Sequence, residues 1–157
     1  MMKKERYIID YLHYEGIDEL PIEDQRLAEA AIDAMTASYA PYSHFNVGAA
    51  VRLDNGTIIL GSNQENIASP SGLCAERTAL FTAGSMYPKH AVMEIAIAGG
   101  PNMTLSDDAV TPCGACRQVM NETQKRSGRC MSVLLIGRKE VYKFNNVQEL
   151  MPFSFEK

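Results

Sequence analysis

The sequence lacks an excess of positive charge. Its 15 lysines and arginines are outnumbered by 19 aspartates and glutamates, which gives a formal net charge of -4 at pH 7. A protein of this charge has no overall positive field to attract the phosphate backbone of a nucleic acid. The composition therefore argues against a nucleic acid polymer as a partner.

Long hydrophobic runs are also missing. No stretch approaches the roughly 18 uninterrupted apolar residues that indicate a membrane-spanning helix. The chain begins with two methionines and two lysines, as a signal peptide can, but Glu5, Arg6 and Asp10 interrupt any apolar core and no small-residue cleavage site follows. We therefore expect a cytoplasmic protein with no membrane partner.

Internal repeats, linkers and low-complexity tracts are absent too. The chain has 157 residues, of which 46% are hydrophobic and 22% are charged. That length allows a single core that buries roughly two thirds of the surface of the unfolded chain. We expect one domain over residues 1–157, which needs no metal or disulfide merely to stay folded.

Cysteine is scarce, with four residues at positions 74, 113, 116 and 130. Without a secretion signal, a Cys-x-x-Cys pair and a distant third cysteine are more typical of metal binding or redox chemistry than of disulfides. The pair alone leaves zinc and redox chemistry both open. Cys130 heads an apolar run, and we expect it to be a buried core thiol.

Hydrophobic periodicity predicts three main helices. Apolar residues recur at helical spacing over residues 23–38, and a second helix is expected over 74–86. The third is expected over 111–128, with Thr111 as its N-cap and Pro112 at its first position. Each helix has an apolar face that requires a sheet or another helix to cover it.

Short β-rich runs alternate with these helices. An Asn-Gly pair at 55–56 predicts a tight hairpin between its flanking runs. Residues 6–14 could form a strand or a short helix, and a short terminal helix is expected near the C-terminus. The other expected strands are 45–53, 57–63, 92–100, 130–137 and 140–145. This order favours an α/β fold, a three-layer α/β/α sandwich with a mixed five-stranded sheet.

Three of the cysteines have the spacing of a zinc site. Cys113 and Cys116 share one face of the expected helix, so both sulfurs can reach one ion at about 2.3 Å. Cys74 begins another helix, where unpaired N–H groups and the helix dipole favour an anionic sulfur. Three protein ligands leave one tetrahedral position open, as in catalytic zinc sites.

Charged residues beside these cysteines complete a candidate active site. Glu76 can lie close to the ion without binding it and act as the general acid and base, while zinc lowers the pKa of bound water to about 7. Three thiolates and Zn²⁺ together carry one negative charge, which a nearby guanidinium would offset. Arg77 and Arg117 are the candidates for that role.

The segments "CAERTA" and "PCGACRQ" resemble the zinc-dependent cytidine deaminases in their short, three-cysteine form. The resemblance runs from about Pro41 to the C-terminus, leaving an N-terminal extension of about 20 residues. It implies hydrolysis of cytidine and 2'-deoxycytidine to uridine and 2'-deoxyuridine, with release of ammonia, in pyrimidine salvage. It also implies one Zn²⁺ per subunit, a free nucleoside as substrate and a homotetramer.

The resemblance further implies substrate contacts that spacing cannot supply. In "NQEN", Asn63 and Glu65 are implied to hydrogen-bond the ribose hydroxyls, although from their own chemistry they could be loop-capping residues. Phe45 is implied to pack against the nucleoside, and the backbone of Ala75 to contact it. Phe155 is implied to be lent to the site of a neighbouring subunit, whereas by residue type both phenylalanines could be core residues.

Two residues depart from the family pattern. Asn46 stands where a proline is usual, which predicts a looser turn after Phe45. Ser69 stands where a tyrosine commonly precedes the proline, so an aromatic contact is missing. His13, His44 and His90 have no partner spacing, and we assign them no metal or catalytic role.

Two alternatives remain open at this point. Within the same chemistry, the substrate could be a polynucleotide or another amino-heterocycle, such as a nucleoside-like antibiotic. From a different class, the chain could be a zinc-stabilised binding module without catalysis. A closed fourth ligand would mark such a module, and Cys130 is the one spare candidate.

Overall fold

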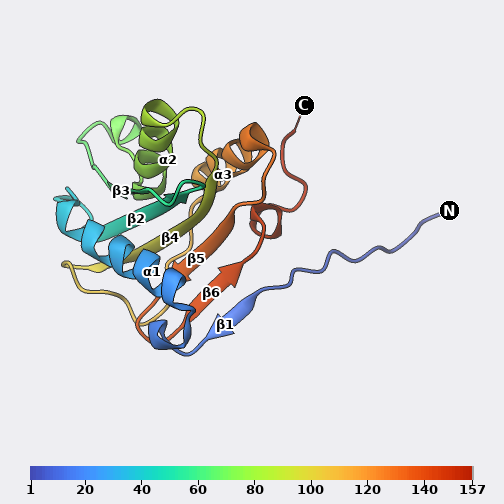
Figure 1. The fold of residues 1–157 in the computed structure, drawn as a ribbon, viewed down its shortest axis with the longest axis horizontal. Helices are drawn as coiled ribbons and strands as arrows, with labels where there is room; N and C mark the ends of the chain where they lie inside the picture. The colour runs from blue at the N-terminus through green and yellow to red at the C-terminus, as the bar shows by residue number, and fades with distance from the viewer. Residues whose placement is uncertain (157) are drawn as a thin grey trace.

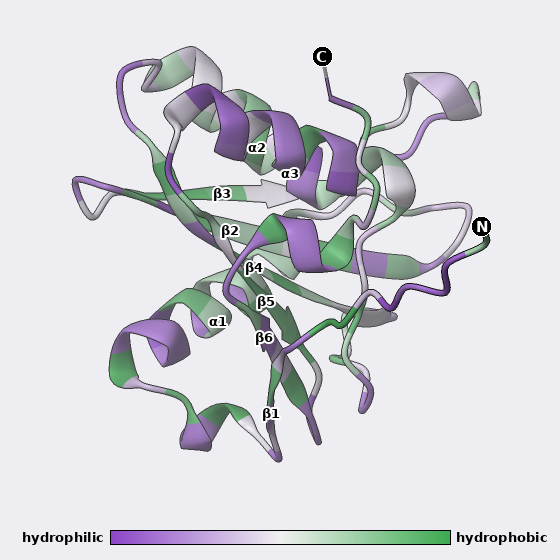
Figure 2. Cartoon of the chain, turned by 90° about the vertical axis from the view of Figure 1, so that its right-hand side faces the viewer, coloured by the Kyte–Doolittle hydropathy of each residue, from purple (hydrophilic) through white to green (hydrophobic). Residues whose placement is uncertain are grey.

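Three layers make up residues 1–156, the part of the chain that the computed structural model describes (Figure 1). A central sheet is covered by α1 on one face and by α2 and α3 on the other, as Figure 2 also shows. The three-layer α/β/α prediction is confirmed. No helix in the described range has the length and apolar character needed to cross a membrane.

The helices and strands alternate along most of the chain. The α-helices are α1 (Ile22–Ala34), α2 (Ala75–Met86) and α3 (Gly114–Ser127). The strands are β1 (Leu12–Tyr14), β2 (Phe45–Leu53), β3 (Ile58–Ser62), β4 (Val92–Pro101), β5 (Ser132–Ile136) and β6 (Val141–Phe144). Four short 3-10 helices are η1 (Ile17–Glu19), η2 (Met35–Ala37), η3 (Ser69–Ser71) and η4 (Val147–Leu150).

The sheet is mixed and has the strand order β1-β6-β5-β4-β2-β3. Only β4 and β5 are parallel; the other neighbouring pairs are antiparallel. It contains six strands where we expected five, because Leu12–Tyr14 pairs with the edge of β6. The ambiguous N-terminal segment thus supplies an edge strand.

The predicted β2–β3 hairpin is confirmed. Gly56 has a φ of +84°, a conformation that glycine adopts without strain. Its N–H donates to the carbonyl of Leu53, and the Asn55 side chain accepts from the N–H of Thr57. The turn therefore has the local chemistry that the Asn-Gly pair indicates.

Two expected helix ends are wrong. Helix α1 ends at Ala34 and is followed by the tighter turn of η2, whereas we expected a helix to residue 38. Thr111 is not the N-cap of α3, because the N-cap is Cys113 in an extended conformation. The carbonyl of Pro112 accepts a hydrogen bond from the Arg117 side chain and lies outside the helix.

The expectation that Cys130 is a core thiol is also wrong. Cys130 is exposed, and its sulfur accepts a hydrogen bond from the Asn146 side chain at 3.6 Å. It lies in the connection between the αL cap at Gly128 and the first residue of β5, Ser132. The residue of this connection that is fully buried is the next one, Met131.

Close backbone contact at Gly61 positions α2 against the sheet. A Cβ atom at Gly61 would lie 2.4 Å from the carbonyl oxygen of Ala75 and 2.5 Å from the backbone nitrogen of Ala79. Only glycine allows the first turns of α2 to lie this close to β3. The start of α2, where Cys74 lies, is therefore fixed by main-chain packing.

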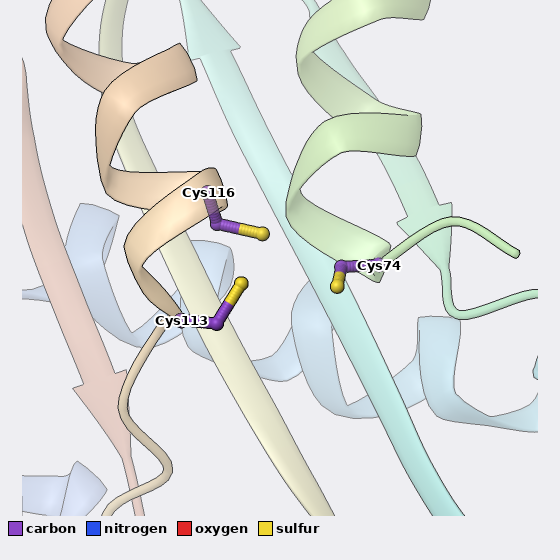
Figure 3. Close-up of side chains that lie close together, drawn as sticks. All are labelled: Cys74, Cys113 and Cys116. Carbon is purple, nitrogen blue, oxygen red and sulfur yellow. The ribbon is translucent and has the colours of Figure 1, made fainter. Parts of the chain in front are cut away.

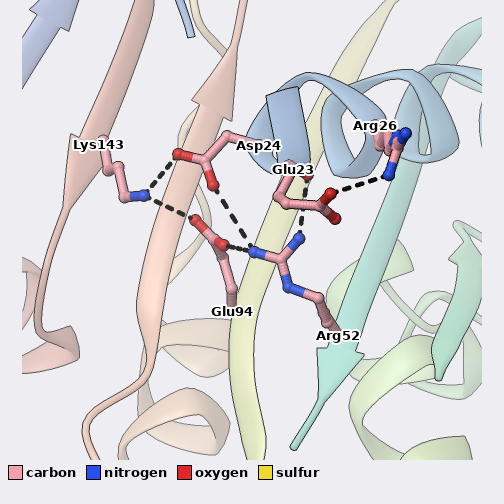
Figure 4. A network of polar contacts seen from close by, with 6 residues as sticks. All are labelled: Glu23, Asp24, Arg26, Arg52, Glu94 and Lys143. Carbon is pink, nitrogen blue, oxygen red and sulfur yellow. Dashed lines mark hydrogen bonds and ion pairs between the residues drawn. The ribbon is translucent and has the colours of Figure 1, made fainter. Parts of the chain in front are cut away.

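A buried network of four charges joins α1 to the sheet (Figure 4). Asp24 and Glu94 are 4% and 3% exposed. The Lys143 Nζ atom lies 2.5 Å from an Asp24 oxygen and 3.3 Å from a Glu94 oxygen, and Arg52 contacts both carboxylates. Burial raises the pKa of Glu94, although Lys143 and Arg52 oppose the rise. With all four groups charged, the network has no net charge.

Replacing Lys143 by methionine is expected to lower the free energy of unfolding by about 3 kcal/mol at neutral pH, because two buried carboxylates would then share one cation. The loss should shrink on acidification. Lys143 lowers the pKa of Glu94, so removing Lys143 raises that pKa further in the folded state. The folded variant then takes up this proton at a higher pH than the intact protein does, and it regains stability relative to the intact protein as the pH falls through that range. Urea unfolding at about pH 7 and about pH 5.5 measures both effects.

Lys139→Met is the matched control. Lys139 pairs with Asp107 at the surface, where its side chain is 71% exposed, so its loss should change stability by at most about 1 kcal/mol. Equal effects of the two substitutions would contradict the role given to Lys143.

Candidate active site

Three cysteines meet where the N-terminal ends of α2 and α3 approach each other (Figure 3). Cys74 is the N-cap of α2, Cys113 is the N-cap of α3, and Cys116 lies in the first turn of α3. Their Sγ atoms all lie within 4.8 Å of one another. The two separated sequence segments are therefore brought together as predicted.

The helix ends favour a negative charge on these sulfurs. Neither Cys74 nor Cys113 accepts a side-chain cap hydrogen bond from the helix that it begins. The backbone N–H groups at both helix starts are therefore not capped by these side chains, and they favour a negative charge nearby. The hydrogen bond from Cys116, aided by the Arg77 guanidinium, lowers the pKa of the Cys74 thiol to about 5. The hydrogen bond that the Cys116 thiol donates to Cys74 raises the pKa of Cys116, and burial raises it further. At least one sulfur is therefore a thiolate at neutral pH.

The sulfur positions fit a zinc ion. Tetrahedral zinc with Zn–S distances of about 2.3 Å holds its sulfurs about 3.8 Å apart. The observed separations, all within 4.8 Å, require only a small inward movement of the side chains. The group contains three donors, and the exposed Cys130 is not among them. Among residues 1–156 the cluster therefore has one donor fewer than the four of a closed structural site.

Glu76 lies beside the sulfurs in the first turn of α2. It is 5% exposed. Burial raises the pKa of its carboxyl, the charge on Cys74 raises it further, and a hydrogen bond from Cys116 opposes the rise. Glu76 is not one of the three clustered donors, so the structure places a buried carboxyl beside the sulfurs and outside their group.

The two arginines have different surroundings. Arg77 Nη2 donates to the Cys74 sulfur at 3.3 Å, which places a positive charge against the cluster. Its Nε atom is buried and has no hydrogen-bond partner among residues 1–156. Arg117 instead donates from Nε to the carbonyl of Pro112 and from Nη1 to that of Leu150. Its guanidinium therefore connects two backbone segments beside the site.

A cavity of about 600 Å³ opens next to Cys74. Its wall contains three residues that the sequence analysis assigned to the site, Asn63, Glu65 and Arg77. Ser69 also lies in the wall. Its volume is within the range of roughly 300–1,000 Å³ that is usual for small-molecule sites. The cavity thus joins the candidate ribose contacts to the sulfur cluster.

Sequence reasoning missed several residues of this wall. They are Tyr42, Gln64, Asn66, Ile67, Gly72 and Leu73. Gly72 and Leu73 could have been found because they directly precede Cys74. Tyr42 carried no such signal, since only the fold brings it next to Glu65, to which its N–H donates.

The Asn63 side chain makes three hydrogen bonds to other residues of the protein. Its Oδ1 accepts from the Ser38 hydroxyl at 2.5 Å and from the N–H of Val47 at 2.8 Å. Its Nδ2 donates one hydrogen to the carbonyl of Phe45. An amide has two N–H donors, so one remains for a ligand.

Glu65 also holds the loop before β2. Its carboxylate accepts from the backbone N–H groups of Tyr42 and Ser43 and from the Ser43 hydroxyl. These bonds, with the hydroxyl first, lower the pKa of Glu65. The side chain is therefore ionised and fixed in place at the cavity wall.

The remaining expected substrate contacts lie outside this wall. Phe45 is half-buried at the start of β2, with its ring next to Gly99. Ala75 is fully buried as the first residue of α2. Phe155 is 70% exposed in the C-terminal segment. Of the three, Phe45 lies next to the wall, because its carbonyl accepts the hydrogen bond from the Asn63 amide.

The turn after Phe45 is not loosened by Asn46. This residue is 6% exposed within β2; its Nδ2 donates to the Ser38 hydroxyl and its Oδ1 accepts from the N–H of Met103. The amide therefore ties two loops together. Ser69 begins η3 and leaves a small side chain in the cavity wall.

Comparison with known proteins identifies the class to which this site belongs. Residues 21–131 match the family described as the cytidine and deoxycytidylate deaminase zinc-binding region. A cytidine deaminase of Sporosarcina psychrophila is 38% identical over 135 residues, which cover 85% of this chain and 91% of that protein. One from Halalkalibacterium halodurans is 44% identical over 101 residues, 64% of this chain and 72% of that protein.

Solved structures give the same result. A crystal structure of cytidine deaminase from Burkholderia pseudomallei has a TM-score of 0.69 and 36% sequence identity, and the match covers 83% of this chain and 97% of that one. The chain belongs to the cytidine and deoxycytidylate deaminase family. Within that family it is a cytidine deaminase, a hydrolase.

Proposed function

We propose that this chain hydrolyses cytidine and 2'-deoxycytidine to uridine and 2'-deoxyuridine and releases ammonia. The observation that carries the proposal is the meeting of three sulfurs from two helix starts beside a buried carboxyl that is not one of the donors. A binding module stabilised by zinc would fill the fourth position with a protein ligand, and the spare cysteine lies outside the cluster.

Different residues have different roles in the proposed reaction. Cys74, Cys113 and Cys116 would hold one zinc ion per subunit, which supplies a Lewis acid that lowers the pKa of water toward neutrality. Glu76 takes a proton from the attacking water and places it on N3 of the ring as the water oxygen bonds to C4. Glu76 then takes the second proton from the new hydroxyl on C4 and passes it to the exocyclic amine; the C4–N bond breaks, ammonia leaves, and C4 becomes the carbonyl of uridine. Arg77 offsets the negative charge of the sulfurs.

Substrate binding is assigned to residues around the cavity. The free N–H of the Asn63 amide and the fixed Glu65 carboxylate suit the ribose hydroxyls, because together they offer a donor and an acceptor. The Ala75 backbone lies at the start of α2, next to Cys74, where it can contact the base. Phe45 packs against the nucleoside from the start of β2.

We further propose that the protein is a cytoplasmic homotetramer that acts in pyrimidine salvage. In this assembly Phe155 reaches the site of a neighbouring subunit. Its 70% exposure supports this role, because the ring has little contact with its own chain.

An ultraviolet assay of cytidine conversion tests the proposed function. We expect turnover of cytidine and 2'-deoxycytidine, no turnover of single-stranded DNA, and one zinc ion per chain by elemental analysis. The acidic net charge of -4 supports the preference for a free nucleoside. Stoichiometric zinc without conversion of either nucleoside would contradict the proposal.

A further inference from the structure

The N-terminal residues of this chain lie outside its family match. The match begins at residue 21, yet residues before it make specific contacts with the C-terminal part of the chain. We call residues 7–14 the strap. It ends in β1, which adds to the edge of the sheet beside β6 (Figure 1).

The middle of the strap is held by aromatic packing. The Tyr11 ring stacks on Phe144 with centroids 5.4 Å apart and meets the edge of Tyr142 at the same distance. Ile9 and Tyr11 also line an apolar cavity of about 360 Å³, and Leu150 is another of its lining residues. The strap therefore packs against the segment that follows β6.

The other end of the strap reaches η4 and the residues after it. The Tyr7 hydroxyl donates to the carbonyl of Gln148 at 3.2 Å, and the Tyr7 ring lies 5.7 Å from that of Phe153. The Gln148 side chain donates to the buried Asn121 of α3 and to Glu156. Tyr7 thus contacts the residues that connect the C-terminal segment to α3.

The same segment is linked to the sulfur cluster. Arg117 donates to the carbonyl of Leu150 at 2.9 Å and to that of Pro112 at 3.0 Å. Pro112 directly precedes Cys113. The strap, η4 and the start of α3 are therefore connected by hydrogen bonds and packing, and Phe155 follows η4 by five residues.

We infer that the strap positions the C-terminal segment, residues 147–156, so that Phe155 is presented to a neighbouring site, with Tyr7 as the main positioning residue. The inference rests on the proposed role of Phe155. A free C-terminal segment would have to be ordered each time substrate binds, which weakens binding without changing the chemical step.

Deleting residues 1–10 tests this inference, because the deletion removes Tyr7 and Ile9 but leaves β1 in place. We expect the KM for cytidine to rise roughly three- to tenfold, in line with the loss of an aromatic contact, while kcat stays within about twofold. Zinc content should not change. Tyr7→Ala should reproduce most of the rise, Tyr7→Phe should recover part of it, and Ile8→Ala, which alters an exposed side chain, should have no effect.

A double-mutant comparison connects the strap to Phe155. Phe155→Ala alone should raise KM as the deletion does, and the two changes combined should raise it no further than Phe155→Ala alone. Additive effects would overturn the inference that the strap acts through Phe155.

Hydrogen exchange provides a readout that does not require activity. The deletion should accelerate exchange of amides in residues 147–156 and leave those of α2 unchanged. Unchanged exchange in residues 147–156 would overturn the inference that the strap orders this segment, even if the enzyme is active. Faster exchange with an unchanged KM would overturn its link to substrate binding. If cytidine is not converted by the intact chain, the proposed function fails, and the exchange result still decides whether the strap orders the segment.

Discussion

A Glu76→Gln protein is expected to keep its zinc and to lose about 10²- to 10⁴-fold in kcat for cytidine, the usual range for removing a general acid and base. Glutamine has nearly the same volume, which matters because Glu76 is only 5% exposed. Its amide cannot accept and return a proton at neutral pH. Steady-state kinetics and zinc analysis on the same preparation measure the two properties together.

Glu94→Gln is the matched control for this experiment. Glu94 is as buried as Glu76, at 3% exposure, but it lies under α1 on the opposite face of the sheet from α2. We expect it to lower stability through its contacts with Arg52 and Lys143 and to leave kcat per folded enzyme within about twofold. A Glu76→Gln enzyme with zinc and near-normal turnover would contradict the proton-transfer role.

The sequence signals that succeeded are local. Cys113 and Cys116 share a helix face because of their spacing, and the Asn-Gly pair at 55–56 carries the chemistry of its turn. Each depends on residues within a few positions. Bringing Cys74 to the other sulfurs required one further step, namely that a thiolate is favoured at a helix start.

The features that sequence reasoning missed depend on distant partners. Strand β1 is three residues long, too short for an alternating pattern, and exists because β6 offers an open edge. Asp24 meets Lys143, 119 positions away, and no periodicity predicts that pairing. Cys130 heads an apolar run, yet the preceding αL cap leaves it exposed and buries the next residue. The substrate contacts of Phe45 and Phe155 stay predictions, because neither residue lines the cavity: Phe45 contacts its wall only through a backbone bond to Asn63, and Phe155 is exposed.

A Cys113→Ser protein is expected to lose more than about 100-fold in zinc affinity and to show no measurable deamination. Removing a direct ligand should exceed the 10- to 100-fold effect of changing a residue that only orients one. The substitution is mild for folding, because Cys113 is exposed and serine is a preferred N-cap residue for a helix such as α3. A chelator titration followed by assay of the washed protein measures the affinity. Far-ultraviolet circular dichroism confirms that α3 persists.

Cys130, the exposed cysteine outside the cluster, supplies the control. It shows whether an effect comes from losing a zinc ligand or from losing any exposed thiol. Cys130→Ser removes a sulfur outside the cluster and should change neither zinc content nor turnover. A thiol reagent should then modify the zinc-loaded Cys130→Ser protein slowly, and chelation should expose the three clustered sulfurs to rapid reaction, because metal-bound thiolates are protected. If Cys113→Ser retained stoichiometric zinc at wild-type affinity, the ion would have to be held without that sulfur. The open coordination position on which the hydrolytic proposal depends would then lose its structural basis.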